Sequence, residues 1–141
     1  MSVYADSSFL VSLYITDRHS PVSRQSILSA PGLWLTPLHD AEWAHAVAQH
    51  VFRRRFSAAE ANQLYRQLEQ DKSAGIWLES GLPDKAFDLC ADLGRRLGPK
   101  LGVRTLDTLH VASAVELKAQ HFWTFDDRQA RLAKAVGLKI L

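Results

Sequence analysis

The chain has 141 residues, of which 47% are hydrophobic, and its 17 basic and 15 acidic side chains leave a net charge of +2. This length and apolar content predict a single domain spanning residues 1–141. The near balance of charge gives no indication of nucleic-acid binding from overall charge alone. One cysteine, Cys90, excludes an intrachain disulfide framework and a multi-thiolate zinc site.

No apolar stretch approaches the ~20 residues that a membrane-spanning helix needs, and the first residues lack a basic segment followed by an apolar one. We therefore expect no membrane association and no signal peptide. A single cysteine also fits a reducing compartment, so we expect a cytoplasmic protein.

Strand-like runs occur at "SVYA" (2–5), "LWLT" (33–36), "GIWLE" (75–79), "HFWTF" (121–125) and "LKIL" (138–141). Segments with helical spacing separate them. These begin near Ser8, Pro21, Leu38, Ala58, Pro83 and Thr105, and a last one covers Asp127–Val136. Short breaks are expected around "SAPG", "ESGLPD" and "LGPKLG". The alternation predicts a three-layer α/β/α sandwich with a mostly parallel sheet of about five strands, because parallel neighbours need crossover connections.

Four carboxylates occupy positions near the ends of predicted strands. Asp6 follows the first strand, Glu42 lies about one turn into the helix after the second, Asp107 opens the helix near Thr105, and Asp126 follows the fourth strand. Binding groups gather at the carboxyl ends of parallel strands, so we expect all four at one edge of the sheet. Each acid can also be read more simply, as a helix cap, a first-turn acid or a solvated helix residue.

A real cluster of these acids would need a counter-charge. Two ionised carboxylates about 5 Å apart repel by roughly 3 kcal/mol at an effective dielectric of ~20. Such a group either takes up protons or binds a cation. Oxygen ligands without thiolates favour Mg²⁺ or Mn²⁺, which lower the pKa of a bound water and neutralise charge on a reacting phosphate.

Three segments together resemble the PIN-domain ribonucleases, and most closely the VapC-type toxins of bacterial toxin–antitoxin modules. They are "YADSSFLVSLY" (4–14), "HDAEWAHAV" (39–47) and "RTLDTLHVASAVELKAQHFWTFDDRQARLAKAVGLKIL" (104–141). The resemblance implies a PIN-like fold and a Mg²⁺- or Mn²⁺-dependent endoribonuclease. In such an enzyme, activated water hydrolyses an RNA phosphodiester and leaves a 5′-phosphate and a 3′-hydroxyl.

The same resemblance assigns the acidic site to Asp6, Glu42, Asp107 and Asp126. The first three would hold the ion directly or through water, and Asp126 would complete the shell or orient the attacking water. Substrate contacts are expected from Ser7 and Arg104.

Ser7 and Arg104, the two candidate substrate-binding residues, can each also have a structural role within the protein. Ser7 or its neighbour Ser8 can hydrogen-bond a site carboxylate or a substrate phosphate, or cap the first helix. Arg104, three residues before Asp107, can contact RNA or pair with the site acids. Arg53, Arg54 and Arg55 form a run that can contact phosphates or complement the end of a helix dipole.

The resemblance implies three partners: an RNA substrate, a cognate antitoxin protein and a second copy of the chain in a homodimer. Apolar positions in the first helix and in the helix from Ala58 are candidates for those protein contacts. They are Phe9, Leu10, Leu13, Tyr14, Leu64, Tyr65 and Leu68. The four tryptophans are expected in the core.

Three other functions compete with this interpretation. A di-iron protein would use the carboxylate-x-x-His pairs Glu42/His45 and Asp107/His110, but it would need long packed helices. A haloacid-dehalogenase phosphatase would need an acid where the chain has Ser8. The serious alternative is a non-catalytic PIN-like module that binds RNA or a partner.

Overall fold

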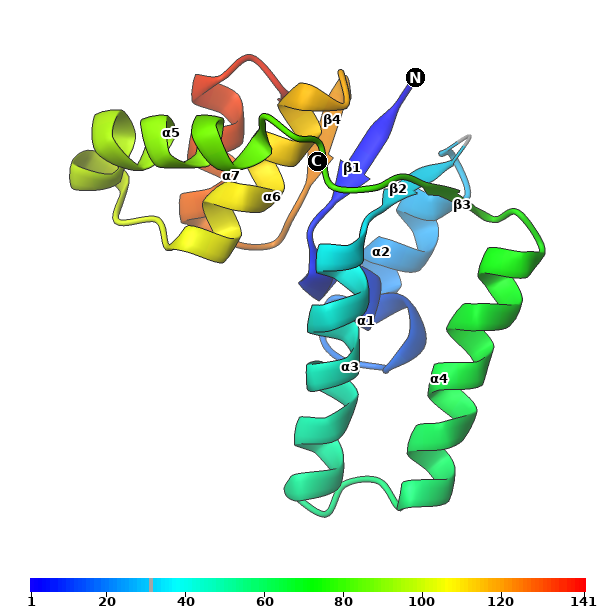
Figure 1. Cartoon of the computed structure of the whole chain (residues 1–141). Coiled ribbons are helices and arrows are strands. Elements are labelled where there is room, and N and C mark those ends of the chain that lie inside the picture. The colour runs from blue at the N-terminus through cyan, green and yellow to red at the C-terminus, as the bar shows by residue number, and fades with distance from the viewer. Residues whose placement is uncertain (31) are drawn as a thin grey trace.

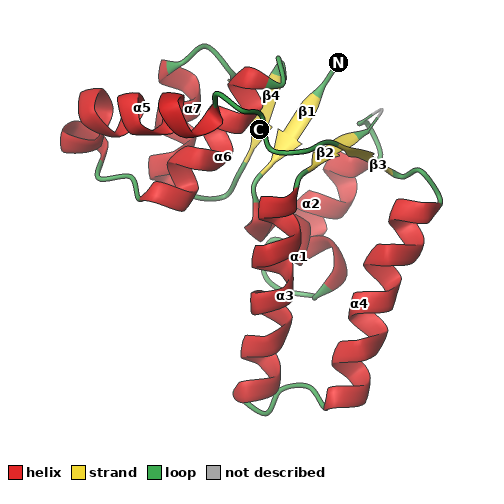
Figure 2. Cartoon of the chain, viewed as in Figure 1, coloured by secondary structure: helices red, strands yellow, loops and turns green. Residues whose placement is uncertain are grey.

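The computed structural model describes residues 1–30 and 32–141, so Pro31, within the predicted "SAPG" break, lies outside the described residues. The strands are β1 (Val3–Ala5), β2 (Leu33–Leu35), β3 (Trp77–Glu79), β4 (His121–Trp123) and β5 (Lys139–Ile140). The helices are α1 (Ser7–Tyr14), α2 (Ser20–Ile27), α3 (Pro37–Phe52), α4 (Ala58–Ser73), α5 (Ala86–Leu101), α6 (Thr105–Glu116) and α7 (Asp127–Ala135). Strands and helices therefore alternate as predicted (Figure 2).

The five strands form one parallel sheet in the order β3-β2-β1-β4-β5. Tyr4 of β1 pairs with Trp34 of β2 on one side and with Phe122 of β4 on the other. The chain adds strands in one direction from β1 to β3 and then crosses to the far side of β1 for β4 and β5. The carboxyl ends of β1 and β4 thus flank the point where strand order reverses, which is where open α/β sheets bind ligands.

Alternate residues of the strands face two different helical layers. Val3, Ala5 and Trp123 belong to a buried cluster with residues of α1, α3 and α4, whereas Tyr4 and Phe122 pack against residues of α6 and α7. The predicted three-layer α/β/α architecture and its five-stranded sheet are confirmed. Trp43, Trp77 and Trp123 are buried and Trp34 is partly buried, as expected for core tryptophans.

The helices extend the fold in two directions from the sheet (Figure 1). α5, α6 and α7 gather on one side, and α3 and α4 run antiparallel away from the sheet to a loop at their far end. None of the described helices is long and apolar enough to cross a membrane.

Two predicted boundaries near the later elements are shifted. The break expected around "LGPKLG" comes only at its last residue, since α5 continues through Pro99 to Leu101 and ends at Gly102, whose φ of 64° is left-handed. The predicted strand "HFWTF" ends at Trp123, two residues early, because Asp126 already caps α7 and the backbone N–H of Asp126 donates to Thr124 Oγ1.

Candidate functional site

Asp6 ends β1 and is also the N-cap of α1. Its side chain accepts a hydrogen bond from the backbone N–H of Phe9 at 2.9 Å, which satisfies one of the free donors at the helix start. The Ser8 hydroxyl lies 2.8 and 2.9 Å from the two carboxylate oxygens, and the Thr124 hydroxyl donates to Oδ2 at 2.9 Å. The carboxyl group is therefore both a cap and the centre of a hydrogen-bonded cluster.

This carboxyl group is almost completely enclosed, with 6% of Asp6 exposed. Burial raises the pKa of Asp6, while the hydrogen bonds from Phe9, Ser8 and Thr124 and the charge of His110 act in the opposite direction. Within the part of the chain that the structure describes, Asp6 forms no ion pair with a Lys, Arg or His side chain. A buried carboxylate in this position is stabilised by a proton or by a cation.

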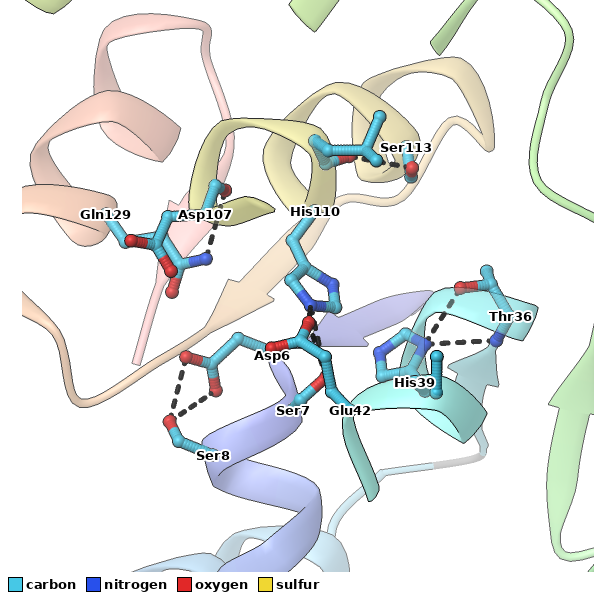
Figure 3. Close-up of polar contacts among 12 residues, drawn as sticks. Asp6, Ser7, Ser8, Thr36, His39, Glu42, Asp107, His110, Ser113 and Gln129 are labelled. Carbon is cyan, nitrogen blue, oxygen red and sulfur yellow. Dashed lines mark hydrogen bonds and ion pairs between the residues drawn. The ribbon is translucent and has the colours of Figure 1, made fainter. Parts of the chain in front are cut away.

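Glu42 reaches the site from α3, which begins after the Thr36 cap. Its Oε1 accepts a hydrogen bond from the Ser7 hydroxyl at 3.1 Å and another from Nε2 of His110 on α6 (Figure 3). Burial alone would raise the pKa of Glu42. The hydrogen bond and charge of His110, with the bond from Ser7, outweigh it and lower that pKa. Glu42 is thus held as a carboxylate.

Behind Glu42 lies a buried group of two histidines and a tyrosine. The Tyr4 hydroxyl is 2.9 Å from Nδ1 of His110. His39 accepts the backbone N–H of Thr36 at Nδ1, so its Nε2–H donates to the carbonyl of Ala5 at 2.7 Å. Burial, followed by the charge of His110, lowers the pKa of His39 to about 3, so His39 is neutral at physiological pH.

Asp107 lies in the first turn of α6 and is partly exposed. Its carboxylate is 3.5 Å from Nε of Arg104, the N-cap residue of the same helix, whose side chain is 84% exposed. Asp107, Arg104 and Glu42 line one open cleft of about 400 Å³ together with Thr105 and Leu106. The cleft therefore contains an exposed cation, Arg104, together with two of the predicted acids.

Asp126 is the N-cap of α7, and its Oδ1 accepts the backbone N–H of Gln129 at 2.8 Å. It is exposed. The side chain of Gln129, which is fully buried, donates to the backbone carbonyl of Asp107 at 3.1 Å and lies 2.7 Å from the Thr124 hydroxyl. Thr124 Oγ1 therefore lies within hydrogen-bond distance of both Asp6 Oδ2 and Gln129 Oε1, and its single hydroxyl hydrogen serves one of these acceptors at a time.

The four predicted acids lie in different environments. Asp6 is buried after β1, Glu42 and Asp107 line the cleft, and Asp126 is exposed at the start of α7. In the described residues, no three His, Cys, Asp or Glu side chains form a group arranged to hold a metal ion.

The chemistry of these donors nevertheless fits Mg²⁺ or Mn²⁺. Mg²⁺ commonly keeps several waters and is held by only one or two carboxylates together with substrate phosphates. Asp6 is a buried carboxylate without an ion-paired partner among the described residues, and the next residue, Ser7, bonds a second carboxylate, Glu42. This arrangement meets that need without a closed cage of ligands.

The two predicted substrate contacts are found in different settings. Ser7 is buried and its hydroxyl bonds Glu42, which is one of the roles expected for it. Ser8 bonds Asp6, so neither serine caps α1. Arg104 is exposed and faces Asp107 across 3.5 Å, a geometry that leaves its remaining donors open to solvent.

Four residues of these networks are absent from the sequence-based site: Tyr4, His39, Thr124 and Gln129. A polar residue on the buried face of a helix was a usable signal for Gln129, since Leu132 and Ala133 follow it by three and four positions. For His39, the usable signal was its position three residues after Thr36, the spacing of a capping box.

The di-iron alternative finds no support in this geometry. His45 is exposed and its Nδ1 bonds the carbonyl of Ala41, one turn earlier in α3. His110 faces Glu42 rather than Asp107. The two carboxylate-x-x-His pairs, Glu42/His45 and Asp107/His110, therefore do not form a shared metal site.

Comparison with known proteins identifies the fold and its relatives. The family model described as PIN domain matches residues 3–135. No curated protein sequence matches the chain.

Three solved structures are similar over nearly their whole length. FitAcB from Neisseria gonorrhoeae shares 16% identity with a TM-score of 0.72, covering 99% of this chain and 96% of that one. VapBC2 from Rickettsia felis, solved with a DNA fragment from the VapBC2 promoter, shares 16% identity with a TM-score of 0.69. The match covers 100% of this chain and 98% of that one. VapC20 from Mycobacterium tuberculosis, a sarcin-ricin loop cleaving toxin, shares 13% identity with a TM-score of 0.68 and coverages of 96% and 95%.

Proposed function

Because the chain belongs to the PIN-domain family, we propose that it is a metal-dependent endoribonuclease and the toxin of a toxin–antitoxin module. The observation that carries this proposal is Asp6, a buried carboxylate without an ion-paired partner among the described residues. It lies at the switch point of a parallel sheet, and the next residue, Ser7, bonds Glu42. The similarity in fold to a sarcin-ricin loop cleaving toxin supports RNA as the substrate.

Asp6 and Glu42 would hold the divalent ion, Mg²⁺ or Mn²⁺, with Asp107 as a ligand directly or through water. When bound, the ion lowers the pKa of a water and neutralises charge on the reacting phosphate. The residues of the chain position the carboxylates that would bind the ion. Ser8 and Thr124 orient the Asp6 carboxylate through hydrogen bonds, and the hydroxyl of Ser7 orients Glu42.

RNA binding would use the exposed side of the cleft. Arg104 is positioned to contact a phosphate beside Asp107, and its freedom from burial suits a residue that must follow a flexible substrate. Asp126, exposed and fixed as a helix cap, would orient the attacking water by accepting a hydrogen bond from it. The products of hydrolysis would carry a 5′-phosphate and a 3′-hydroxyl.

An antitoxin protein and a homodimer are part of the same proposal. The similarity to FitAcB and to VapBC2 supports a protein partner. Phe9, Leu10 and Leu68, which were candidates for such contacts, are buried in the core. An open groove of about 420 Å³ lined by Tyr14, Leu64 and their neighbours is the better candidate.

The test is cleavage of total bacterial RNA by the purified chain and by Asp6→Asn, each with Mg²⁺, Mn²⁺ or EDTA, followed by mapping of the new ends. Asn keeps the cap and removes the charge. We expect metal-dependent cuts with 5′-phosphates from the wild type only, and slowed growth of a bacterial host that expresses the wild type only.

Two outcomes would contradict the proposal. Equal cleavage by Asp6→Asn would remove the assigned site. Folded wild-type protein that cuts no RNA with either metal would favour the alternative, a non-catalytic PIN-like module that binds RNA or a partner.

A further inference from the structure

The two oxygens of Glu42 have different surroundings. Oε1 accepts both the hydroxyl of Ser7 and Nε2–H of His110. Among the described residues, no hydrogen bond reaches Oε2. One oxygen is therefore anchored by the protein, and the other is available to a ligand in the cleft that Glu42 lines.

The direction of the hydrogen bond between His110 and Glu42 follows from the chemistry of the two groups. An ionised carboxylate only accepts, so Nε2 of His110 must carry the hydrogen that it shares with Glu42. At the other ring nitrogen, the Tyr4 hydroxyl lies 2.9 Å from Nδ1. Hydrogen bonds at both ring nitrogens therefore hold the His110 side chain.

Packing holds the His110 ring in this orientation. His110 is 2% exposed, and the rings of Tyr4 and His39 lie 5.7 and 4.9 Å from it, both at steep angles. His39 is itself fixed by bonds to Thr36 and to the carbonyl of Ala5. The hydrogen-bonded group thus spans three elements, with Tyr4 on β1, His110 on α6 and Glu42 on α3 (Figure 3).

We propose that His110, held in place by Tyr4, is a positioning residue that orients the Glu42 carboxylate toward the divalent cation. This inference rests on the proposed function, since it assumes that Glu42 is a metal ligand. His110 acts through Glu42 and does not touch the ion or the RNA. Hydrogen-bonded partners of this kind change metal affinity by roughly 10- to 100-fold when they are removed.

The test is a double-mutant cycle on Mn²⁺ affinity, measured from the electron paramagnetic resonance signal of free Mn²⁺ with the full chain and no RNA. We expect His110→Leu to weaken Mn²⁺ binding by about tenfold or more. In a Glu42→Ala background the same change should alter affinity by less than about twofold, because the residue through which His110 acts is gone. His110→Gln, which keeps a donor near the Nε2 position, should stay within about threefold of the wild type.

Tyr4→Phe provides a second cycle with little change in packing, and it tests the role of His110 even when His110→Leu does not fold. We expect it to weaken Mn²⁺ binding by about threefold or more, again only when Glu42 is present. Tyr14→Phe is the matched control, because the Tyr14 hydroxyl bonds Asp71, on α4 and outside the site. Its Mn²⁺ affinity should equal that of the wild type.

The inference is overturned when folded His110→Leu and Tyr4→Phe bind Mn²⁺ as the wild type does, or when their losses are the same with and without Glu42. A wild type that binds no Mn²⁺ overturns this inference and the proposed metal site together. A wild type that binds Mn²⁺ but cuts no RNA contradicts the nuclease alone, and the cycles still decide the role of His110.

Discussion

Asp6 and Asp126 stand in the same local setting at the ends of two neighbouring strands. Each caps the helix that follows and accepts the backbone N–H three residues later, at 2.9 and 2.8 Å. Asp6, however, is 6% exposed, with a raised pKa caused mainly by burial, whereas Asp126 is exposed.

The difference comes from the position of the two strands. β1 is the middle strand of five, so its carboxyl end is covered by α3 and α6 as well as by its own helix, while β4 has only the two-residue β5 beyond it. A helix cap and a metal-site carboxylate are therefore not alternatives. An aspartate at this position can cap a helix, bind a metal ion or do both, depending on the tertiary contacts around it.

The largest expected effect is on RNA cleavage, which Asp6→Asn should lower much more than Asp126→Asn does. Asp6→Asn should lower RNA cleavage by about a hundredfold or more, and Asp126→Asn by less than about tenfold, because Asn preserves both caps and only Asp6 is a proposed ligand. Single-turnover cleavage of one RNA at saturating Mg²⁺ measures both. Equal losses would show that burial does not distinguish the roles of the two carboxylates.

A smaller effect is expected on the pH dependence of stability. The folded pKa of Asp6 lies above its unfolded value, so between the two the folded state binds more protons and the free energy of unfolding falls as pH rises. This loss of stability is complete above the folded pKa of Asp6. Between the unfolded and folded pKa values, the free energy of unfolding falls by at most about 1.4 kcal/mol per pH unit. Asp6→Asn has no such penalty.

Urea unfolding of the wild type and Asp6→Asn in EDTA, from about pH 4 to about pH 8, measures this difference. We expect the wild type to lose stability relative to the variant as pH rises. A difference that stays constant with pH would show that the buried carboxyl group keeps an ordinary pKa.

The smallest expected effect concerns capping alone. Asp126→Ala should lower the free energy of unfolding by about 1 kcal/mol, and Asp126→Asn by a few tenths at most, because Asn still accepts the Gln129 N–H. Urea unfolding at neutral pH compares them. Equal stability of Asp126→Ala and the wild type would remove the capping role and leave Asp126 as a functional residue only.

Sequence patterns predicted the alternation of strands and helices and the parallel sheet. They were less accurate where local signals compete. Pro99 suggested a break, but α5 continues through it for two more residues and ends at Gly102. Thr124 and Phe125 continue a β-rich run, yet they form the turn that precedes the α7 cap.

The partners of the acids were beyond reach of those patterns. Glu42 and His110 are 68 residues apart and Asp6 and Thr124 are 118 apart, so no periodicity relates them. His110 was noticed for its spacing from Asp107, but the structure directs it to Glu42 instead. The spacing within a helix describes neighbours on that helix, whereas the contact depends on how α6 packs against α3.

The sequence by itself determined which residues end strands and begin helices, because those signals are local: β-branched and aromatic runs, caps such as Asp6 and Asp126, and helical spacing. Only the tertiary structure decided which acid is buried, which one faces His110 and which one meets Arg104. Burial and charge pairing depend on the segments that pack across the sheet, and the pKa values of the acids follow from those contacts.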